Sequence, residues 1–239
     1  VPDPRLEVLS QISHSTTIIP ATIEFIDIAG LVKGASKGEG LGNKFLANIR
    51  DVSAIVHVLR CFDDDQVIHV DGKIDPVGDM QVINIELILS DYDQCEQAIA
   101  NQKKRTRNND KVEVQRLEVL ETCLKALSEE TPLRALSLSD DEQRIIKDYR
   151  FLTLKKVIYL CNVSDQALEN DHVKALREAV SDEDASVIPL CAQFEQELSS
   201  LEDDEKQEFL EEYGLKESGL TRLAKESFSL LGLQTYLTT

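Results

Sequence analysis

The feature that most constrains this chain is an apolar run at residues 22–26 that leads into Asp27 and then into a glycine-rich loop. Glycines follow at positions 30, 34, 38, 40 and 42. A buried strand that ends in a carboxylate is how α/β proteins place an acid beside Mg²⁺, and Gly30 would let a backbone N–H approach a phosphate. The pattern therefore predicts nucleotide chemistry at the carboxyl edge of a sheet.

The phosphate cradle that such chemistry needs is absent from the sequence. The string Gly-x-x-x-x-Gly-Lys-Ser/Thr holds the β- and γ-phosphates through its backbone N–H groups and its lysine. It occurs nowhere in the 239 residues. The chain begins with Val1, and its one methionine is Met80. We therefore expect a piece of a longer protein, called here the parent protein, whose cradle lies upstream.

Composition narrows the class of protein. No apolar run approaches the roughly 18 residues of a membrane span, so no membrane partner is expected. The five cysteines are scattered without a C-x-x-C pair, which is typical of reduced thiols in a cytoplasmic protein. The net charge of −18 opposes binding of nucleic acid by the whole surface, and no DNA partner is expected.

Four short apolar runs rich in β-branched residues predict strands at residues 22–26, 54–59, 157–161 and 186–190. Because the runs are mostly apolar at consecutive positions, both faces of each strand should be covered, as in a parallel α/β sheet. Helical patterns predict helices at residues 44–50, 171–180 and 203–213. The expected fold class is therefore α/β with a mostly parallel sheet.

The segment from about residue 82 to residue 150 predicts an antiparallel helical arm inserted into the sheet domain. Apolar residues recur at spacings of three and four, which places each set on one helix face. The two sets are Ile88, Tyr92, Cys95 and Ile99, then Leu117, Leu120, Leu124 and Leu127. Residues 108–110, Asn-Asn-Asp, predict the turn between them. Ser139 and Glu142 predict a capping box that starts a further short helix.

Two later strand ends carry residues suited to holding a nucleotide base. An Asn-x-x-Asp follows the strand at 157–161, where GTPase-like proteins read the base, and a small-residue loop follows the strand at 186–190. The candidate base-binding residues are Asn162, Val163, Asp165, Cys191 and Ala192. These elements and the earlier Asp-x-x-Gly stand in the order of a GTPase-like site.

Beyond these elements, the sequence resembles one family from end to end. Residues 27–43, DIAGLVKGASKGEGLGN, look like the signature of the YchF family, the Obg-like ATPases. Further segments are similar to the same family, namely residues 1–6, 60–62, 68–70, 151–155 and 233–236. The resemblance implies a P-loop G domain that is interrupted by a coiled-coil arm and followed by a small TGS domain.

On that template the chain divides into three parts. Residues 1–81 would be the first part of an N-terminally truncated G domain, residues 82–150 the coiled-coil insertion, and residues 151–239 the second part of the G domain. The sheet would lack its first strand, and the chain would end where the TGS domain begins. In the family's sheet order, the absent strand lies between residues 22–26 and residues 54–59.

The resemblance also implies roles at the phosphates. Asp27 would reach Mg²⁺, and the N–H of Gly30 would approach the γ-phosphate. Leu31 stands where ordinary GTPases carry a glutamine, and leucine cannot orient water. The family is thought to use a histidine instead, whose position corresponds to His69, and an imidazole that titrates near neutrality suits that task. The alternative is that His69 only packs in an apolar run, as we expect for His57.

The base motif departs from the family at one position. YchF-like proteins typically end it in glutamate and prefer ATP, whereas Asp165 is nearer to the GTPase form. ATP is therefore the expected substrate, and GTP or dual use is the alternative.

The predicted function is an Obg-like ATPase of the translation-factor class that hydrolyses ATP to ADP and phosphate with Mg²⁺. The resemblance implies a ribosomal partner, the large subunit or the 70S particle. The basic run Lys103–Arg107 at the arm tip would meet ribosomal RNA, or would be a solvated turn. The competing prediction is that residues 1–239 alone are inactive, a non-catalytic ribosome- or RNA-binding module, because the main phosphate ligands are missing.

Overall fold

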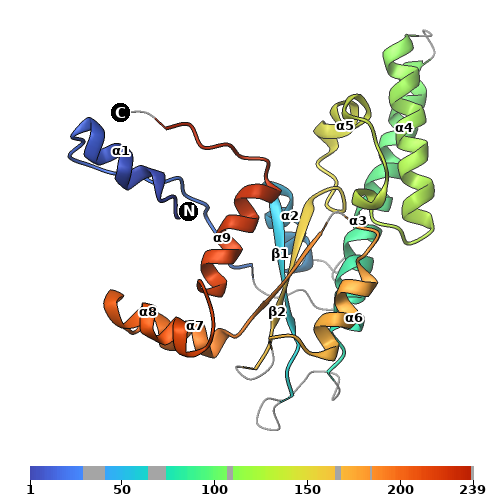
Figure 1. Ribbon diagram of the computed structural model, residues 1–239. Coiled ribbons are helices and arrows are strands. Elements are labelled where there is room, and N and C mark those ends of the chain that lie inside the picture. Colours follow the sequence, from blue (N-terminus) through green and yellow to red (C-terminus); the bar gives the residue numbers. More distant parts are fainter. Residues whose placement is uncertain (29–40, 64–73, 107–109, 165–167, 184, 238–239) are drawn as a thin grey trace.

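The computed structural model describes residues 1–28, 41–63, 74–106, 110–164, 168–183 and 185–237, and Figure 1 shows their arrangement. Three parallel strands form the sheet in the order β1 (Ala54–Arg60), β2 (Lys156–Asn162) and β3 (Ser186–Leu190). Three of the four predicted strands and the parallel α/β class are therefore confirmed.

The prediction of a strand at residues 22–26 is wrong. The backbone of residues 22–28 lies outside the sheet, and the side chains of Phe25 and Ile26 are 51% and 60% exposed. A strand needs a partner for its N–H and C=O groups. In the family's sheet order, another strand would lie between this segment and β1, and no described residues form it. Residues 22–26 therefore have no neighbouring strand among the described residues with which to pair.

Each face of the sheet is covered by different helices. Val157, Tyr159 and Cys161 of β2 point into the core on the side of α6 (Asp171–Ala179), whereas Ile158 and Leu160 point to the side of α9 (Gly219–Leu230). Figure 1 shows α9 on one side of the sheet and α3 (Pro76–Arg105) and α6 on the other. This two-sided burial explains the continuous apolar run of β2. In β1, at the edge of the described sheet, Val58 is 62% exposed.

Of the remaining helices outside the arm, those at residues 41–51 and 203–212 were predicted from the sequence, and those at residues 5–13 and 192–199 were not. They are α1 (Arg5–Ser13), α2 (Leu41–Asp51), α7 (Ala192–Ser199) and α8 (Asp203–Glu212). Gly214 follows α8 with a φ of +66°, the left-handed conformation expected where that helix ends. Within the described part of the chain, none of the helices is long and apolar enough to cross a membrane.

The helical arm is confirmed. Helix α3 has 30 residues and packs against α4 (Lys111–Ser128). All eight apolar residues of the two predicted sets lie in or against the core that these helices share. Asp110 caps α4 by accepting a hydrogen bond from the N–H of Val112 at 2.9 Å. The predicted capping box of Ser139 and Glu142 starts α5 (Asp140–Ile146). Two short 3-10 turns, Leu133–Ala135 and Lys147–Tyr149, complete the base of the arm.

The predicted boundary at residue 82 falls inside α3. The helix begins at Pro76, and Met80 in its second turn packs in the core beneath the sheet before the helix continues into the arm. One rod of helix therefore joins the sheet domain to the arm without a hinge of irregular backbone.

A buried polar cluster, the junction cluster of Asn84, Arg134, Tyr159 and Glu183, fixes the base of the arm to the sheet. Arg134 donates to Glu183 Oε2 at 2.7 Å, to Asn84 Oδ1 at 3.0 Å and to the Tyr159 hydroxyl at 3.0 Å. The side chains of Arg134 and Glu183 are only 5% and 13% exposed. Charged groups this buried remain stable because each has charged and neutral partners.

His57 of β1 packs beside this cluster, as expected for a structural histidine, with its ring centroid 5.9 Å from that of Tyr159. Burial, and then the positive charge of Arg134, lower the pKa of His57 to about 4. The folded protein thus keeps His57 neutral over a pH range in which the unfolded chain binds a proton.

The free energy of unfolding should therefore fall by about 3 kcal/mol as the pH drops from 6.5 to 4, through this group alone. Urea denaturation across that range checks the slope. A His57→Phe variant should lose the part of the slope that comes from His57. An identical slope in the variant would show that His57 titrates normally in the folded protein.

Candidate nucleotide site

The carboxyl ends of the three strands are held level with one another. The N–H of Cys61, just after β1, donates to the carbonyl of Asn162 at 2.7 Å. The N–H of Val163 donates to the carbonyl of Leu190 at 3.0 Å. These bonds continue the parallel ladders past the last strand residues, so the residues that follow each strand meet at one edge of the sheet.

Asn162 and Ala192, two of the predicted base-binding residues, lie together at this edge. The side-chain oxygen of Asn162 accepts a hydrogen bond from the N–H of Ala192 at 3.1 Å, which links the end of β2 to the first residue of α7. The bond fixes the orientation of the Asn162 amide. It therefore holds the asparagine of the base motif against the small-residue loop.

Val163 and Cys191 support this edge from inside. Both side chains are buried, with 2% and 6% exposure, and both belong to the core beneath the sheet. The sulfur of Cys191 accepts a hydrogen bond from the N–H of Phe194 at 3.4 Å and so caps the N-terminus of α7. These two residues shape the edge, and Ala192 is the exposed member of the loop.

Sequence reasoning missed Asn170. It caps α6 by accepting from the N–H of Val173 at 3.0 Å, and its amide donates to the carbonyl of Cys61 at 2.7 Å. Asn170 thus ties α6 to the end of β1. An asparagine directly before the helical pattern at 171–180 is the signal that could have revealed the cap, although not its second bond.

Asp27, the predicted Mg²⁺ ligand, is exposed and follows the unpaired segment. Within the described residues, no three histidine, cysteine, aspartate or glutamate side chains come together as a metal site. Mg²⁺ in nucleotide sites is typically held by one or two carboxylates with substrate phosphates and water. A single exposed carboxylate therefore fits the role without requiring a cluster of protein ligands.

The other predicted site residues, Gly30, His69 and Asp165, lie outside the described residues. Residues 108–109 of the turn predicted at residues 108–110 do as well. The described geometry therefore concerns the base side of the predicted site. The described contacts do not bring Asp27 to that edge, because its neighbour Ile28 packs with Leu152, which precedes β2.

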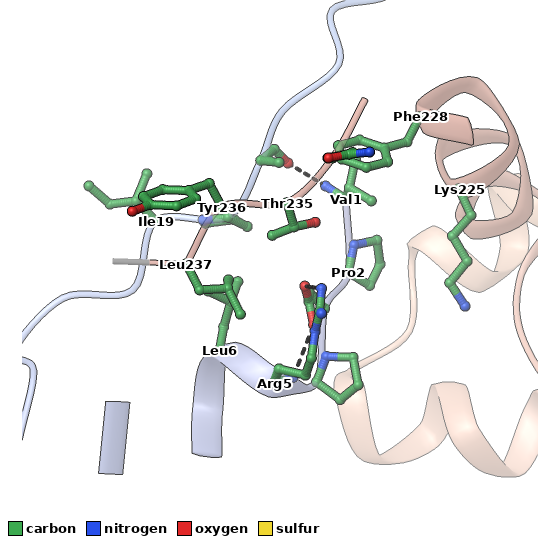
Figure 2. A pocket seen from close by; sticks show the side chains of 15 residues that line it. Val1, Pro2, Arg5, Leu6, Ile19, Lys225, Phe228, Thr235, Tyr236 and Leu237 are labelled. Carbon is green, nitrogen blue, oxygen red and sulfur yellow. Dashed lines mark hydrogen bonds and ion pairs between the residues drawn. The ribbon is translucent and has the colours of Figure 1, made fainter. Parts of the chain in front are cut away.

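A hollow of about 530 Å³ lies elsewhere, between the N-terminal segment, α9 and the C-terminal segment. Figure 2 shows Leu6, Ile19 and Tyr236 on one side of it and Phe228 and Lys225 of α9 on the other. None of the predicted nucleotide-binding residues lines this hollow. It is therefore not the candidate site.

Comparison with known proteins agrees with this architecture. A family model described as a 50S ribosome-binding GTPase matches residues 9–91. Proteins named ribosome-binding ATPase YchF from Haemophilus ducreyi and Escherichia coli O157:H7 are each 48% identical over 239 residues. The protein of that name from Bacillus subtilis is 46% identical over 242 residues. Each alignment covers all of this chain and 66% of the relative, so the chain spans just under two thirds of these proteins.

A solved structure of the Schizosaccharomyces pombe YchF GTPase has the same fold. It superposes with a TM-score of 0.83 at 33% sequence identity, over 97% of this chain and 64% of that one. This likeness supports the assignment of the sheet and its inserted arm to a P-loop G domain.

Proposed function

Because the chain belongs to the YchF family, we propose that its parent protein hydrolyses ATP to ADP and phosphate. The observation that carries the proposal is the hydrogen bond from the Ala192 N–H to the Asn162 side chain. It joins the two strand ends at which GTPase-like proteins hold the base. The relatives' names and the matching family model support the same class of enzyme.

Each phosphate-side residue has a distinct task in this proposal. The Asp27 carboxylate meets Mg²⁺, which when bound would neutralise charge on the phosphates. The N–H of Gly30 donates to the γ-phosphate. His69 orients the attacking water or takes its proton. On the base side, Asn162, Val163, Asp165, Cys191 and Ala192 surround the ring.

We further propose that ATP binds more tightly than GTP. The relatives from bacteria are named ATPases, whereas the yeast relative is named a GTPase, so GTP use is the alternative. Asp165 is the residue that would favour guanine, because a carboxylate can accept from the two guanine donors that adenine lacks.

Fluorescent mant-ATP and mant-GTP titrations of the parent protein test this choice. We expect the Kd for ATP to be about tenfold lower, which corresponds to about 1.4 kcal/mol of binding free energy. Tighter binding of GTP would overturn the ATP assignment and leave the nucleotide site in place.

Residues 1–239 alone should bind nucleotide weakly or not at all, because their sequence contains no Gly-x-x-x-x-Gly-Lys-Ser/Thr cradle. Equilibrium dialysis with ATP and Mg²⁺ compares this stretch with the parent protein. If both bound with the same affinity, the cradle would not be needed. A parent protein that bound no nucleotide would favour the alternative function, a non-catalytic ribosome- or RNA-binding module.

The proposed partner of the parent protein is the ribosome, in the cytoplasm. The arm offers a contact surface, because Lys103, Lys104 and Arg105 are exposed in the last turn of α3. In a protein with a net charge of −18, cations at the end of a long helix can meet RNA phosphates that the remaining surface repels.

A further inference from the structure

Helix α2 is docked onto the arm helix α3 by an apolar patch. Leu46 and Ile49 of α2 are buried in one cluster with Leu87 of α3 and with Leu152, which precedes β2. Ile83 of α3 packs against the same cluster. Positions 83, 87, 90 and 94 are spaced 4-3-4 and therefore share one face of α3. The apolar half of that face packs against the middle of α2.

The polar half of the same face contacts Arg50, which lies in the last turn of α2. The Arg50 guanidinium donates to Ser90 Oγ at 3.0 Å and to the side-chain oxygen of Gln94. Gln94 in turn donates to the carbonyl of Tyr149 at 2.5 Å. A guanidinium that bonds two side chains one helical turn apart holds its partner helix more firmly than a single contact would.

A second set of bonds holds the C-terminal end of α2 from the other side. The Lys155 ammonium donates to the carbonyls of Arg50 at 3.0 Å and Val52 at 2.5 Å. Arg150 pairs with Asp51 at 3.3 Å. Lys155 precedes β2, and Arg150 ends the base of the arm, so α2 is held by both. Any displacement of α2 must therefore strain or move the arm base.

The docked cluster also contacts the residue that follows Asp27 in the sequence. Ile28, the neighbour of Asp27 in sequence, packs against the cluster of Leu46 and Ile49. A shift of Asp27 toward Mg²⁺ and phosphate would therefore press on α2 through Ile28. The described contacts form a continuous path from Asp27 through α2 to α3.

Helix α3 can carry such a shift to the arm tip. From Gln94, where Arg50 binds, α3 continues as unbroken helix to Arg105, which is about 17 Å at 1.5 Å per residue. Because the contact lies near the base and the junction cluster holds the sheet end of the rod, a small rotation at Gln94 becomes a larger displacement at the tip.

We propose that Arg50 couples the nucleotide site to the helical arm, so that the arm tip changes position when nucleotide binds. The inference rests on the proposed function, because it requires nucleotide at Asp27. It goes beyond that function by naming a residue outside the site that transmits its state. Arg50 is a positioning residue, and it touches neither nucleotide nor partner in this account.

Pulsed electron-electron resonance on the parent protein tests the coupling. Spin labels at Lys104→Cys on the arm tip and Lys174→Cys on α6 report the distance between arm and sheet domain, and the five cysteines of residues 1–239 are all buried. Addition of a non-hydrolysable ATP analogue with Mg²⁺ should shift the distance distribution by about 2–5 Å. The Arg50→Ala variant should lose most of that shift and keep its affinity for the analogue.

Matched variants separate coupling from loss of fold. Gln94→Ala removes the partner on the arm side and should reduce the shift as Arg50→Ala does. Arg144→Ala removes an exposed arginine of α5 that pairs with Asp141, and it should leave the shift intact. A full shift in both Arg50→Ala and Gln94→Ala would overturn the coupling. Unchanged distances in a wild-type protein that binds the analogue would also overturn it, with the proposed function left standing, whereas absence of analogue binding would overturn both.

Discussion

Replacement of His69 with alanine is expected to lower the turnover number for ATP hydrolysis by about 10²- to 10⁴-fold. The imidazole would orient the attacking water or accept its proton, and Leu31 at the usual glutamine position offers no substitute. The Kd for ATP should stay unchanged, because His69 acts on the water and not on the nucleotide. Steady-state phosphate release and mant-ATP titration on the same preparation separate the two quantities.

His57 provides the matched control. It is a second histidine of an apolar run, and it packs beside Tyr159 in the sheet. A His57→Phe variant should retain turnover within about twofold at neutral pH, where His57 is already uncharged. Unchanged turnover in the His69→Ala variant would remove His69 from the mechanism and favour its alternative role as a packing residue.

Replacement of Asp91 with alanine should lower the free energy of unfolding by about 4 kcal/mol. Asp91 of α3 is fully buried and accepts from the N–H groups of Leu152 and Thr153 at 2.9 and 2.7 Å and from the Thr153 hydroxyl at 2.8 Å. Its removal leaves two backbone donors buried without an acceptor. Urea denaturation of the purified variant measures the loss.

Two further variants test that reason. Burial raises the pKa of Asp91, and the hydrogen bonds from Thr153 and Leu152 oppose that rise. Asp91→Asn keeps one acceptor oxygen and places an N–H₂ group against a backbone donor, so its loss should be intermediate. Asp93→Ala, at an exposed position of the same helix, should change stability by less than about 0.5 kcal/mol. Equal losses at positions 91 and 93 would mean that the buried bonds contribute little.

Elements that follow from local pattern were predictable from the sequence. Strand β2 is a continuous apolar run because helices cover both of its faces, and β1 and β3 are mostly apolar as well. The apolar residues between the two arm helices recur at helical spacing, and the capping box of Ser139 and Glu142 needs only four residues. In each case the information lies within one segment. The order of the strand ends then predicted that Asn162 and Ala192 would meet.

What the sequence could not reveal depends on partners far away in the chain. Residues 22–26 have the composition of a strand, but strand formation depends on a pairing edge, and that edge is not among the described residues. Arg50 and Gln94 are 44 residues apart, and Asp91 and Thr153 are 62 residues apart. An arginine in a last helical turn or an acid on a helix predicts an exposed charge, and only the fold shows which of them is buried against a partner.

In the proposed function, the ends of β2 and β3 hold a nucleotide base. A mant-ATP titration of the parent protein, set beside the same titration of its Asn162→Ala variant, tests this most directly, with thermal melts to confirm that both are folded. We expect saturable binding by the wild-type protein and an affinity weakened by about tenfold or more in the variant. Equal affinities in two folded proteins, or no binding to the wild-type protein, would contradict it.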